Sequence, residues 1–285
     1  MKIINRLLTI SAISAVGIGI SYRKWLDISD TLINADIKKN TTICLISDLH
    51  DFEYGKDNIV LLRAIKERKP DYVTICGDLT NSYANHTDTG IKLVKNIKNL
   101  GIPVVYVNGN HELIMSQVHP DAYKQFIKEL KAYGAVILDD ENYETETINF
   151  IGYTNKMKQY GKFRGIYKLS KDELSAELNK KHGNLIRKDK YNIMLAHNPV
   201  YLREYADYNA DLVLSGHLHG GIVRLPFIGG IMSPQTFFGR RYSAGLYKEG
   251  SCHMYVSRGL GVHTIPLRLF NRPELAFITI KRRDS

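Results

Sequence analysis

Five short apolar runs in this sequence each end in side chains that can bind metal ions. The runs cover residues 45–50, 73–78, 105–111, 193–197 and 212–219. Runs of aliphatic and β-branched residues of this length predict strands buried on both faces, so the polar residues that follow lie at strand ends. Because the carboxyl ends of parallel strands share one edge of a sheet, these distant side chains can meet in one cleft.

The side chains at these strand ends are carboxylates, an amide and imidazoles. They belong to Asp48, His50, Asp78, Asn110, His111, His197, His217 and His219. A set of oxygen and nitrogen donors without thiolates is typical of sites for hard or borderline divalent metal ions. Two pairs, Asp48 with His50 and His217 with His219, are spaced so that both side chains would point the same way if the strand period continued.

Glycines precede several of the candidate ligands. One stands directly before Asp78, Asn110 and His217, and glycine lets the backbone turn sharply and approach a bound group. Each short motif taken singly is more often a turn or a structural residue. Five of them in one chain, each at the end of a predicted strand, argue for a common site. Three acidic residues that merely neighbour the motifs are interpreted as structural: Asp51, Glu53 and Glu112.

Strand and helix patterns alternate through the first half of the chain. Strands are expected at residues 43–47, 71–76 and 104–107, and helices at 58–69, 89–100 and 121–133. This alternation predicts a mostly parallel sheet with helical crossovers. The runs at 135–138, 143–148 and 149–152 follow one another too closely for helices between them, which predicts hairpins and an antiparallel portion.

Alternation returns in the second half. Ser170 and Glu173 have capping-box spacing, which predicts a helix from there to about residue 182. Strands are expected at 192–196, 211–215, 253–256 and 275–280, with a short helix after Pro199. The whole pattern predicts an α/β fold in which two packed β-sheets lie between outer helices.

Composition is that of a globular protein with a basic surface. Of 285 residues, 44% are hydrophobic and 24% charged, and 39 Lys and Arg against 29 Asp and Glu give a net charge of +10. Such a charge favours anionic partners, although a lysine-rich proteome would explain it equally well. Lysines in the predicted helices at 89–100 and 121–133 alternate with apolar positions, as on solvated faces, so nucleic acid is not an expected partner.

The three cysteines, Cys44, Cys76 and Cys252, lie in strand-like runs and are interpreted as core residues, with a Cys44–Cys76 disulfide as the alternative.

The N-terminus carries an uncharged, largely apolar stretch at residues 7–22, flanked by Lys2 and Arg6 before it and by Arg23 and Lys24 after it. Its length lies between a signal-peptide core of about 7–15 residues and a transmembrane helix of about 17–25. We interpret residues 1–40 as a membrane anchor with a juxtamembrane stretch, and residues 41–285 as the folded domain. A cleaved signal is the alternative. Positive charge on both sides leaves the orientation open, with the extracytoplasmic side favoured.

The ordered motifs D-x-H at 48–50, G-D at 77–78, G-N-H-E at 109–112, the lone His197 and G-H-x-H at 216–219 resemble the calcineurin-like metallophosphoesterase superfamily. The resemblance covers about residues 42–220, and every motif position matches. Residues 225–230, 243–247, 257–261 and 271–275 are similar to a bacterial membrane-associated, phosphodiesterase-like subgroup. The resemblance implies a four-layer α-β-β-α sandwich of two mixed sheets flanked by helices.

The resemblance also implies two divalent metal ions, which could be manganese, iron or zinc. Asp48, His50, Asp78 and His219 would bind one ion, and Asp78, Asn110, His197 and His217 would bind the other. Asp78 would bridge the two. His111 would be the histidine that binds no metal and either protonates the leaving oxygen or stabilises its charge.

Magnitudes support metal-assisted phosphoryl chemistry. Enzymes accelerate the slowest phosphate-ester hydrolyses up to ~10²¹-fold, whereas positioned acid–base groups supply about 10²–10⁴-fold. Two ions roughly 3.5–4 Å apart can hold phosphoryl oxygens and produce a metal-bound hydroxide near neutral pH. Only Asp48 and Asp78 offset the charge of the ions, so the site would suit an anionic ester.

We therefore predict a metal-dependent phosphoric ester hydrolase, and in particular a phosphodiesterase or diphosphatase that uses a metal-bound hydroxide. A phosphomonoesterase or phosphoprotein phosphatase is one alternative, and a nuclease another. A non-catalytic scaffold of the same fold is a third, although intact Asn110 and His111 argue against it.

Residues 222–243 follow directly on two predicted ligands and are rich in Gly, Phe and Ile. They contain the predicted substrate-binding residues Arg224, Arg240 and Arg241. An apolar rim with arginines would suit a small-molecule or lipid-linked phosphate ester. The alternative is a hairpin packed on the sandwich with surface arginines. Oligomeric state stays open, and so does the metal, because such donor sets accept several divalent ions.

Overall fold

The computed structural model describes residues 25–82, 87–161, 165–225, 227–231, 235, 242–262 and 267–283. The apolar stretch at residues 7–22 lies outside the described residues, as do Arg240 and Arg241. Within the described ranges, no helix is both long enough and apolar enough to cross a membrane.

The first sheet has six strands. In spatial order they are β1 (Asp27–Ala35), β14 (Glu274–Arg282), β2 (Thr41–Ile46), β3 (Tyr72–Cys76), β4 (Val104–Val107) and β5 (Ala135–Ile137). Strands β2 to β5 run parallel to one another, and β14 is antiparallel to β2. The apolar runs of β2, β3 and β4 are almost wholly buried, as expected for strands covered on both faces.

The second sheet also has six strands. Their order is β12 (Gly245–Glu249), β13 (Cys252–Val256), β9 (Leu212–Ser215), β8 (Tyr191–Ala196), β7 (Ile148–Tyr153) and β6 (Glu141–Glu144). The four central strands are parallel, and each edge strand is antiparallel to its neighbour. A short hairpin of β10 (Arg224–Leu225) and β11 (Gly229–Gly230) stands apart from both sheets.

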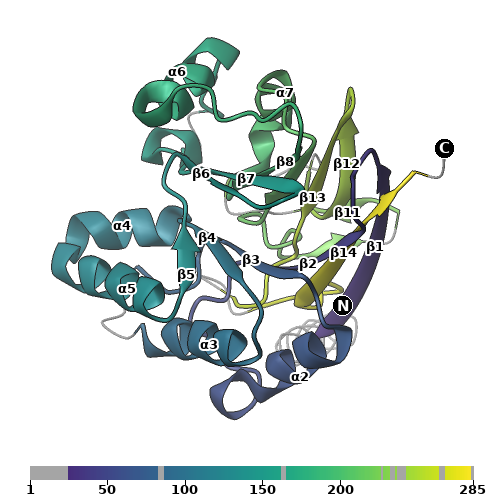
Figure 1. Cartoon of the computed structure of the whole chain (residues 1–285). Coiled ribbons are helices and arrows are strands. Elements are labelled where there is room, and N and C mark those ends of the chain that lie inside the picture. Colours follow the sequence, from purple (N-terminus) through teal and green to yellow (C-terminus); the bar gives the residue numbers. More distant parts are fainter. Residues whose placement is uncertain are drawn as a thin grey trace, which may run out of the picture.

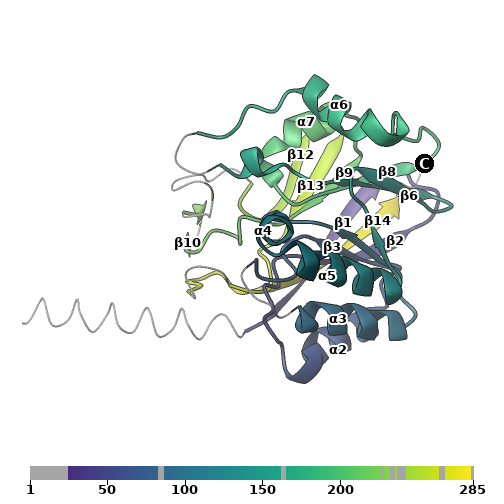
Figure 2. The same ribbon diagram turned by 90° about the vertical axis from the view of Figure 1, so that its left-hand side faces the viewer.

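Helices cover the outer faces of the two sheets (Figures 1 and 2). Helices α2 (Ile59–Arg68), α3 (Asp88–Asn99), α4 (Asn110–Val118) and α5 (Pro120–Ala132) lie on the first sheet. Helices α6 (Lys171–His182) and α7 (Leu202–Asp207) lie on the second. Three 3₁₀ turns complete the described helices: η1 (Lys56–Asn58), η2 (Met157–Tyr160) and η3 (Pro199–Tyr201). Buried residues such as Leu45, Val105 and Phe150 fill the space between the sheets, which confirms the four-layer α-β-β-α sandwich.

Three elements differ from the sequence interpretation. Residues 27–35 were assigned to a juxtamembrane stretch, but they form β1, which pairs with β14 along its whole length, so the folded part begins before residue 41. Helix α4 was not expected. Strand β5 was expected in the antiparallel portion but pairs in parallel with β4, because the crossover through α4 and α5 is long enough to bring the chain back in the same direction.

The cysteines are core residues, as predicted. Cys44, Cys76 and Cys252 are buried and free, so the alternative disulfide between Cys44 and Cys76 is not formed. In the register of β2 and β3, Cys44 lies opposite Val73 rather than Cys76.

Candidate metal centre

The predicted donor residues meet at the carboxyl ends of β2, β3, β8 and β9 and at the start of α4. Three groups of side chains have donor atoms within 4.8 Å of one another: Asp48, His50 and His219; His50, Asp78 and His111; and Asp78, His197 and His217. All seven are buried. Asn110 is the first residue of α4, beside His111, and its Oδ1 atom is buried with no hydrogen-bond partner among the described residues. The structure therefore brings all eight predicted residues to one edge shared by the two sheets.

The first group contains donor atoms at distances suited to one shared cation. His219 Nε2 lies 3.2 Å from His50 Nε2 and 3.4 Å from Asp48 Oδ1. His50 Nε2 is 3.8 Å from Asp78 Oδ2. Metal bonds of about 2.1 Å at tetrahedral or octahedral angles would place neighbouring donors about 3.0–3.4 Å apart. Two imidazole nitrogens at this separation, both facing a carboxylate, fit a metal ion between them.

In the group of Asp78, His197 and His217, a hydrogen bond fixes the tautomer of His197. Its Nδ1 atom lies 2.6 Å from the carbonyl oxygen of Cys76. Because a carbonyl only accepts, Nδ1 carries a proton and donates it, as metal-binding histidines commonly do. Nε2 then faces Asp78 Oδ2 at 3.1 Å and Asp48 Oδ1 at 3.8 Å. The same oxygen of Asp78 thus faces His50 on one side and His197 on the other.

Burial and charge act in opposite directions at this centre. Burial raises the pKa of Asp48 to about 6, against the opposing effect of His197. Burial lowers the pKa of His197, but the carboxylates of Asp78 and Asp48 outweigh it and raise the value to about 9. Burial, then His50 and Arg268, hold the pKa of His219 well below its usual value, so its lone pair is available. The two buried carboxylates therefore favour a cation between them, which can be a proton on His197 or a metal ion.

The backbone at most of these positions adopts the left-handed conformation, which is uncommon for residues other than glycine. The φ angles are 52° at Asp48, 48° at His50, 52° at Asp78, 69° at His217 and 49° at His219. Asp and His tolerate this region better than bulky residues, but each instance still costs energy, and such residues cluster at functional sites. The strand direction ends at these residues, so the two-residue spacing does not act through a continued strand.

Two glycines allow the metal-binding loops to touch. A Cβ atom on Gly109 would lie within 2.2 Å of Asp78 Oδ1, and one on Gly77 would lie 2.6 Å from the Gly109 Cα atom. Gly77 also has a φ of 76°. The glycines before Asp78 and Asn110 are thus needed for the close approach of two chain segments, rather than for the approach of a bound group.

Glu112, which sequence interpretation left out of the site, connects the same two loops. Its Oε1 accepts hydrogen bonds from the backbone N–H groups of Leu79 (2.8 Å) and Thr80 (3.3 Å). Its Oε2 accepts from those of Asp78 (2.9 Å) and Gly109 (2.8 Å). Four donors on one fully buried carboxylate fix the positions of Asp78 and Asn110 relative to each other. Its spacing of three residues from Gly109 resembles half of a capping box, the one sequence signal that could have indicated this role.

His111 is oriented by Ser82. The backbone N–H of Ser82 lies 3.2 Å from His111 Nδ1, and its hydroxyl oxygen lies 3.0 Å from the same atom. A backbone N–H can only donate, so Nδ1 is the acceptor and the ring proton is on Nε2. The backbone N–H of His111 in turn donates to Asp78 Oδ1 at 2.8 Å. The ring is thereby held beside His50, with 4.7 Å between ring centres.

Tyr160 is a further side chain of the centre that the sequence did not indicate. Its ring packs edge-on against His217, with ring centres 4.9 Å apart, and lies 6.1 Å from His197. Its hydroxyl is buried without a hydrogen-bond partner among the described residues. Burial, and then the charge of Asp78, raise the pKa of Tyr160 well above its usual value, so the hydroxyl stays protonated.

Of the three predicted substrate-binding arginines, one is described. Arg224 starts β10, five residues after His219, and its Nη1 atom donates to the carbonyl of Gly220 (2.7 Å) and to Ser243 Oγ (3.3 Å). These bonds hold its guanidinium beside the loop that carries His219. Arg240 and Arg241 lie outside the described residues.

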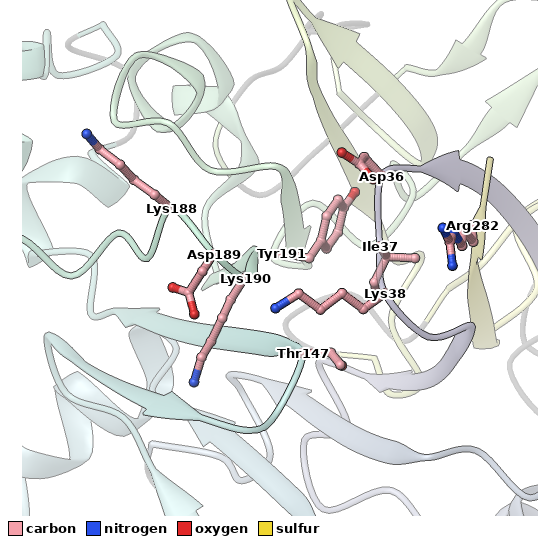
Figure 3. A pocket seen from close by; sticks show the side chains of 9 residues that line it. All are labelled: Asp36, Ile37, Lys38, Thr147, Lys188, Asp189, Lys190, Tyr191 and Arg282. Carbon is pink, nitrogen blue, oxygen red and sulfur yellow. The ribbon is translucent and has the colours of Figure 1, made fainter. Parts of the chain in front are cut away.

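A separate cavity of about 370 Å³ lies at the opposite, amino end of β8 (Figure 3). It is lined by Asp36, Ile37, Lys38, Thr147, Lys188, Asp189, Lys190, Tyr191 and Arg282. None of the predicted ligands borders it. Lys190 Nζ is already paired with Glu144 Oε2 at 2.9 Å, and two aspartates offset two of the three remaining cations. This cavity is therefore distinct from the candidate metal centre.

Comparisons with known proteins find similar sequences and structures. A family model described as calcineurin-like phosphoesterase matches residues 41–221. The chain is similar to an uncharacterized metallophosphoesterase, YkuE, of Bacillus subtilis, with 31% identity over 250 residues, covering 84% of this chain and 78% of that one. It is also similar to the phosphodiesterase YaeI of Escherichia coli, with 40% identity over 88 residues, which is 31% of this chain and 32% of that one. Among solved structures, a dimetal phosphatase from Danio rerio has 12% identity and a TM-score of 0.43, with 79% of this chain and 89% of that chain covered.

Proposed function

We propose, from the premise that this chain belongs to the calcineurin-like phosphoesterase family and is a metal-dependent phosphoric ester hydrolase, that it is a phosphodiesterase or diphosphatase with a dinuclear metal centre. The observation that carries the proposal is the convergence of two donor clusters, Asp48–His50–His219 and Asp78–His197–His217. Asp78 Oδ2 lies between them, 3.8 Å from His50 Nε2 and 3.1 Å from His197 Nε2. In this assignment, Asp48, His50, Asp78 and His219 bind one ion, and Asp78, Asn110, His197 and His217 bind the other.

The charges of these residues support an anionic substrate. Two carboxylates, Asp48 and Asp78, are the charged ligands, and the imidazoles and the Asn110 amide are neutral. When bound, two divalent ions would supply Lewis acidity and activate water at neutral pH. Four positive charges against two negative ones leave a net positive centre, which attracts a phosphoryl group and stabilises the negative charge that develops on it.

His111 supplies the proton in this proposal. With Nδ1 accepting from Ser82, its proton is on Nε2, the nitrogen that can donate to the oxygen of a departing alcohol or phosphate. Ser82 and the backbone bond to Asp78 keep the ring in that orientation. Hydrolysis of a phosphodiester releases an alcohol, and hydrolysis of a diphosphate releases a phosphate. In both reactions the oxygen of the departing group is stabilised by such a proton donor.

The finer substrate class is supported by two further observations. The relative YaeI is itself named a phosphodiesterase. Apolar residues of the β10–β11 hairpin, which follows His219 directly, are exposed, and Arg224 stands at the start of β10. These features favour a phosphate ester that carries a lipid or another hydrophobic group. As part of the same proposal, residues 7–22 attach the protein to a membrane, with the domain on the extracytoplasmic side.

Activity assays on the full-length chain, purified in detergent, test this proposal. The protein is loaded with Mn²⁺, Zn²⁺ or Fe²⁺ and supplied with bis-p-nitrophenyl phosphate, p-nitrophenyl phosphate or a nucleotide-sugar diphosphate. We expect metal-dependent turnover that is faster on the diester or diphosphate than on the monoester. Turnover that is faster on the monoester would reject the subclass. No metal-dependent turnover of any ester, with Asp78→Asn indistinguishable from wild type, would reject the enzyme.

A further inference from the structure

Large apolar side chains are exposed on the β10–β11 hairpin, on the segment before β14 and at the start of the described chain. Phe227 is fully exposed, Phe270 is 57% exposed and Trp25 is 54% exposed. Leu225 and Ile228, on either side of Phe227, are also exposed. We call these five residues the apolar rim. Soluble proteins rarely expose a contiguous apolar patch of large side chains unless it contacts a partner or a membrane.

The three segments that carry the apolar rim are joined to one another. The backbone N–H of Arg224 donates to the carbonyl of Leu269 (3.0 Å), and that of Leu269 donates to the carbonyl of Ile222 (3.1 Å). These bonds link the hairpin to the segment before β14. The guanidinium of Arg272 lies over the Trp25 ring at 5.3 Å, which links that segment to the start of the described chain. In Figure 2 the β10 hairpin and the yellow segment before β14 both project from the left side of the sandwich.

The two phenylalanines stand on backbone that does not favour them. The φ angle is 65° at Phe227 and 52° at Phe270. A bulky residue in the left-handed region is an outlier and costs energy. Burial of the ring in the protein core would offset that cost, but Phe227 is fully exposed and Phe270 is 57% exposed. The conformation therefore presents these rings outward, where an apolar surface from outside the chain can cover them.

The apolar rim is coupled to the metal centre by one side chain. Asn271, next to Phe270, donates through Nδ2 to the carbonyl of His219 at 2.7 Å and also to the carbonyl of Gly221. Gly221 leads directly into the hairpin that carries Phe227. A surface from outside the chain that covered the apolar rim would therefore lie next to the loop that carries His219.

Lipid is the occupant that the neighbouring sequence favours. The uncharged stretch at residues 7–22 ends three residues before Trp25, and Arg23 and Lys24 lie between them. Tryptophan and phenylalanine are favoured at the bilayer interface, where basic side chains meet anionic headgroups. A soluble protein partner would not require this combination at the end of an apolar stretch.

We propose that the apolar rim docks on the surface of a lipid bilayer, with Phe227 and Phe270 inserted among the lipids and the metal centre facing the headgroups. This inference rests on the membrane attachment included in the proposed function. It adds that the folded domain itself contacts lipid and that the substrate reaches the centre from the membrane side.

An environment-sensitive label tests the docking. Phe227→Cys and Phe270→Cys are each labelled with an NBD fluorophore in the full-length chain, since Cys44, Cys76 and Cys252 are buried. Leu246→Cys, at an exposed position of β12 outside the apolar rim, is the matched control. The proteins are reconstituted into vesicles of phosphatidylcholine and phosphatidylglycerol. We expect labels at 227 and 270 to be quenched by spin-labelled lipid and shielded from aqueous iodide. The label at 246 should be quenched by iodide and unaffected by spin-labelled lipid.

Three outcomes separate the alternatives. Iodide accessibility at 227 and 270 equal to that at 246, in a protein that floats with the vesicles, would overturn the docking while leaving membrane attachment intact. Shielding without quenching by spin-labelled lipid would show that a second copy covers the rim, which would also overturn it. Failure of the full-length chain to float would reject the membrane attachment itself. The double variant Phe227→Ser with Phe270→Ser should lose shielding at a third labelled position, Ile228→Cys, and unchanged shielding there would overturn the docking.

Discussion

Replacing Glu112 by glutamine tests whether a buried carboxylate holds the metal-binding loops together. Glutamine has nearly the same size but only one oxygen. Whichever way it turns, two of the four backbone N–H groups that Glu112 now accepts would face an NH₂ group. Each buried N–H left unpaired costs about 1–3 kcal/mol, so the free energy of unfolding should fall by about 2–6 kcal/mol. For a chain of this size, that loss should lower the melting temperature by at least about 4 °C.

Metal affinity should fall with stability, because Glu112 fixes Asp78 and Asn110 relative to each other. Loss of a group that orients ligands typically costs about 10–100-fold in metal affinity. Both quantities are measured at pH 8, above the pKa of about 7 to which burial and then the charge of Asp78 raise the Glu112 carboxyl. Thermal unfolding is followed in EDTA, and Mn²⁺ binding by calorimetry.

Glu53→Gln is the matched control for this experiment. Glu53 is exposed and accepts a single long hydrogen bond, from the backbone N–H of Asp57 at 3.2 Å. Its replacement should change stability by less than about 0.5 kcal/mol. If the Glu112 and Glu53 variants melted at the same temperature and bound Mn²⁺ with the same affinity, the reasoning about the four hydrogen bonds would be refuted.

Three further substitutions make separate predictions. Asp78→Asn removes a carboxylate that both donor groups share, and diester turnover should fall by about 10³-fold in a protein that remains folded; turnover near the wild-type value would contradict a shared ligand. Ser82→Ala removes the hydroxyl beside His111 Nδ1, and kcat should fall about tenfold for esters with poor leaving groups but little for p-nitrophenyl esters; equal losses on both would exclude a role for the His111 proton in leaving-group departure. Tyr160→Phe removes a buried hydroxyl that has no described partner, so the melting temperature in EDTA should stay the same or rise. In Tyr153→Phe, by contrast, a hydroxyl that bonds to two side chains is lost, and the free energy of unfolding should fall by about 1–3 kcal/mol. A lower melting temperature for the Tyr160 variant than for the Tyr153 variant would show that the hydroxyl is bonded after all.

The central strands could be predicted because their pattern is local. Strands β2, β3, β4, β8 and β9 are short runs of aliphatic residues buried on both faces, and β4 has the bounds that the sequence indicates. Where each strand ends, a polar residue with metal-binding capacity follows, which was enough to predict the convergence of the donors. The two-sheet architecture follows from the alternation of elements and from the family resemblance.

Elements that depend on distant partners could not be predicted in the same way. Strand β1 contains two Asp residues and one Asn, types that are depleted in strands, so its local strand signal is weak. Its conformation comes from pairing with β14, which is more than 230 residues away in sequence. Helix α4 begins with Asn110 and His111, so its first turn is occupied by residues of the centre instead of an apolar stripe, and its periodicity is hidden.

The donors of the centre were readable from sequence, but the residues that position them were not. Ser82 and Glu112 act on residues about 30 positions away, through hydrogen bonds that only the fold creates. Asn271 acts on His219 from 52 positions away. No local pattern distinguishes such a residue from an ordinary polar one, which explains why Glu112 was interpreted as structural.

The centre combines costs that folding alone does not recover. Five of the predicted ligands have left-handed backbone, and two carboxylates are buried in one cluster, where burial raises the pKa of Asp48 to about 6. Groups outside the donor set hold the ligands in this unfavourable arrangement. Glu112 ties together the loops after β3 and β4, and Asn271 holds the loop after β9. Each of these side chains binds backbone groups of loops that follow the strands. The positions of the donors are therefore fixed by the two sheets to which those loops are attached. A divalent cation would then bind to ligands that are already in position. Neutralising the buried carboxylates would stabilise the complex, and none of that free energy would be needed to order the loops.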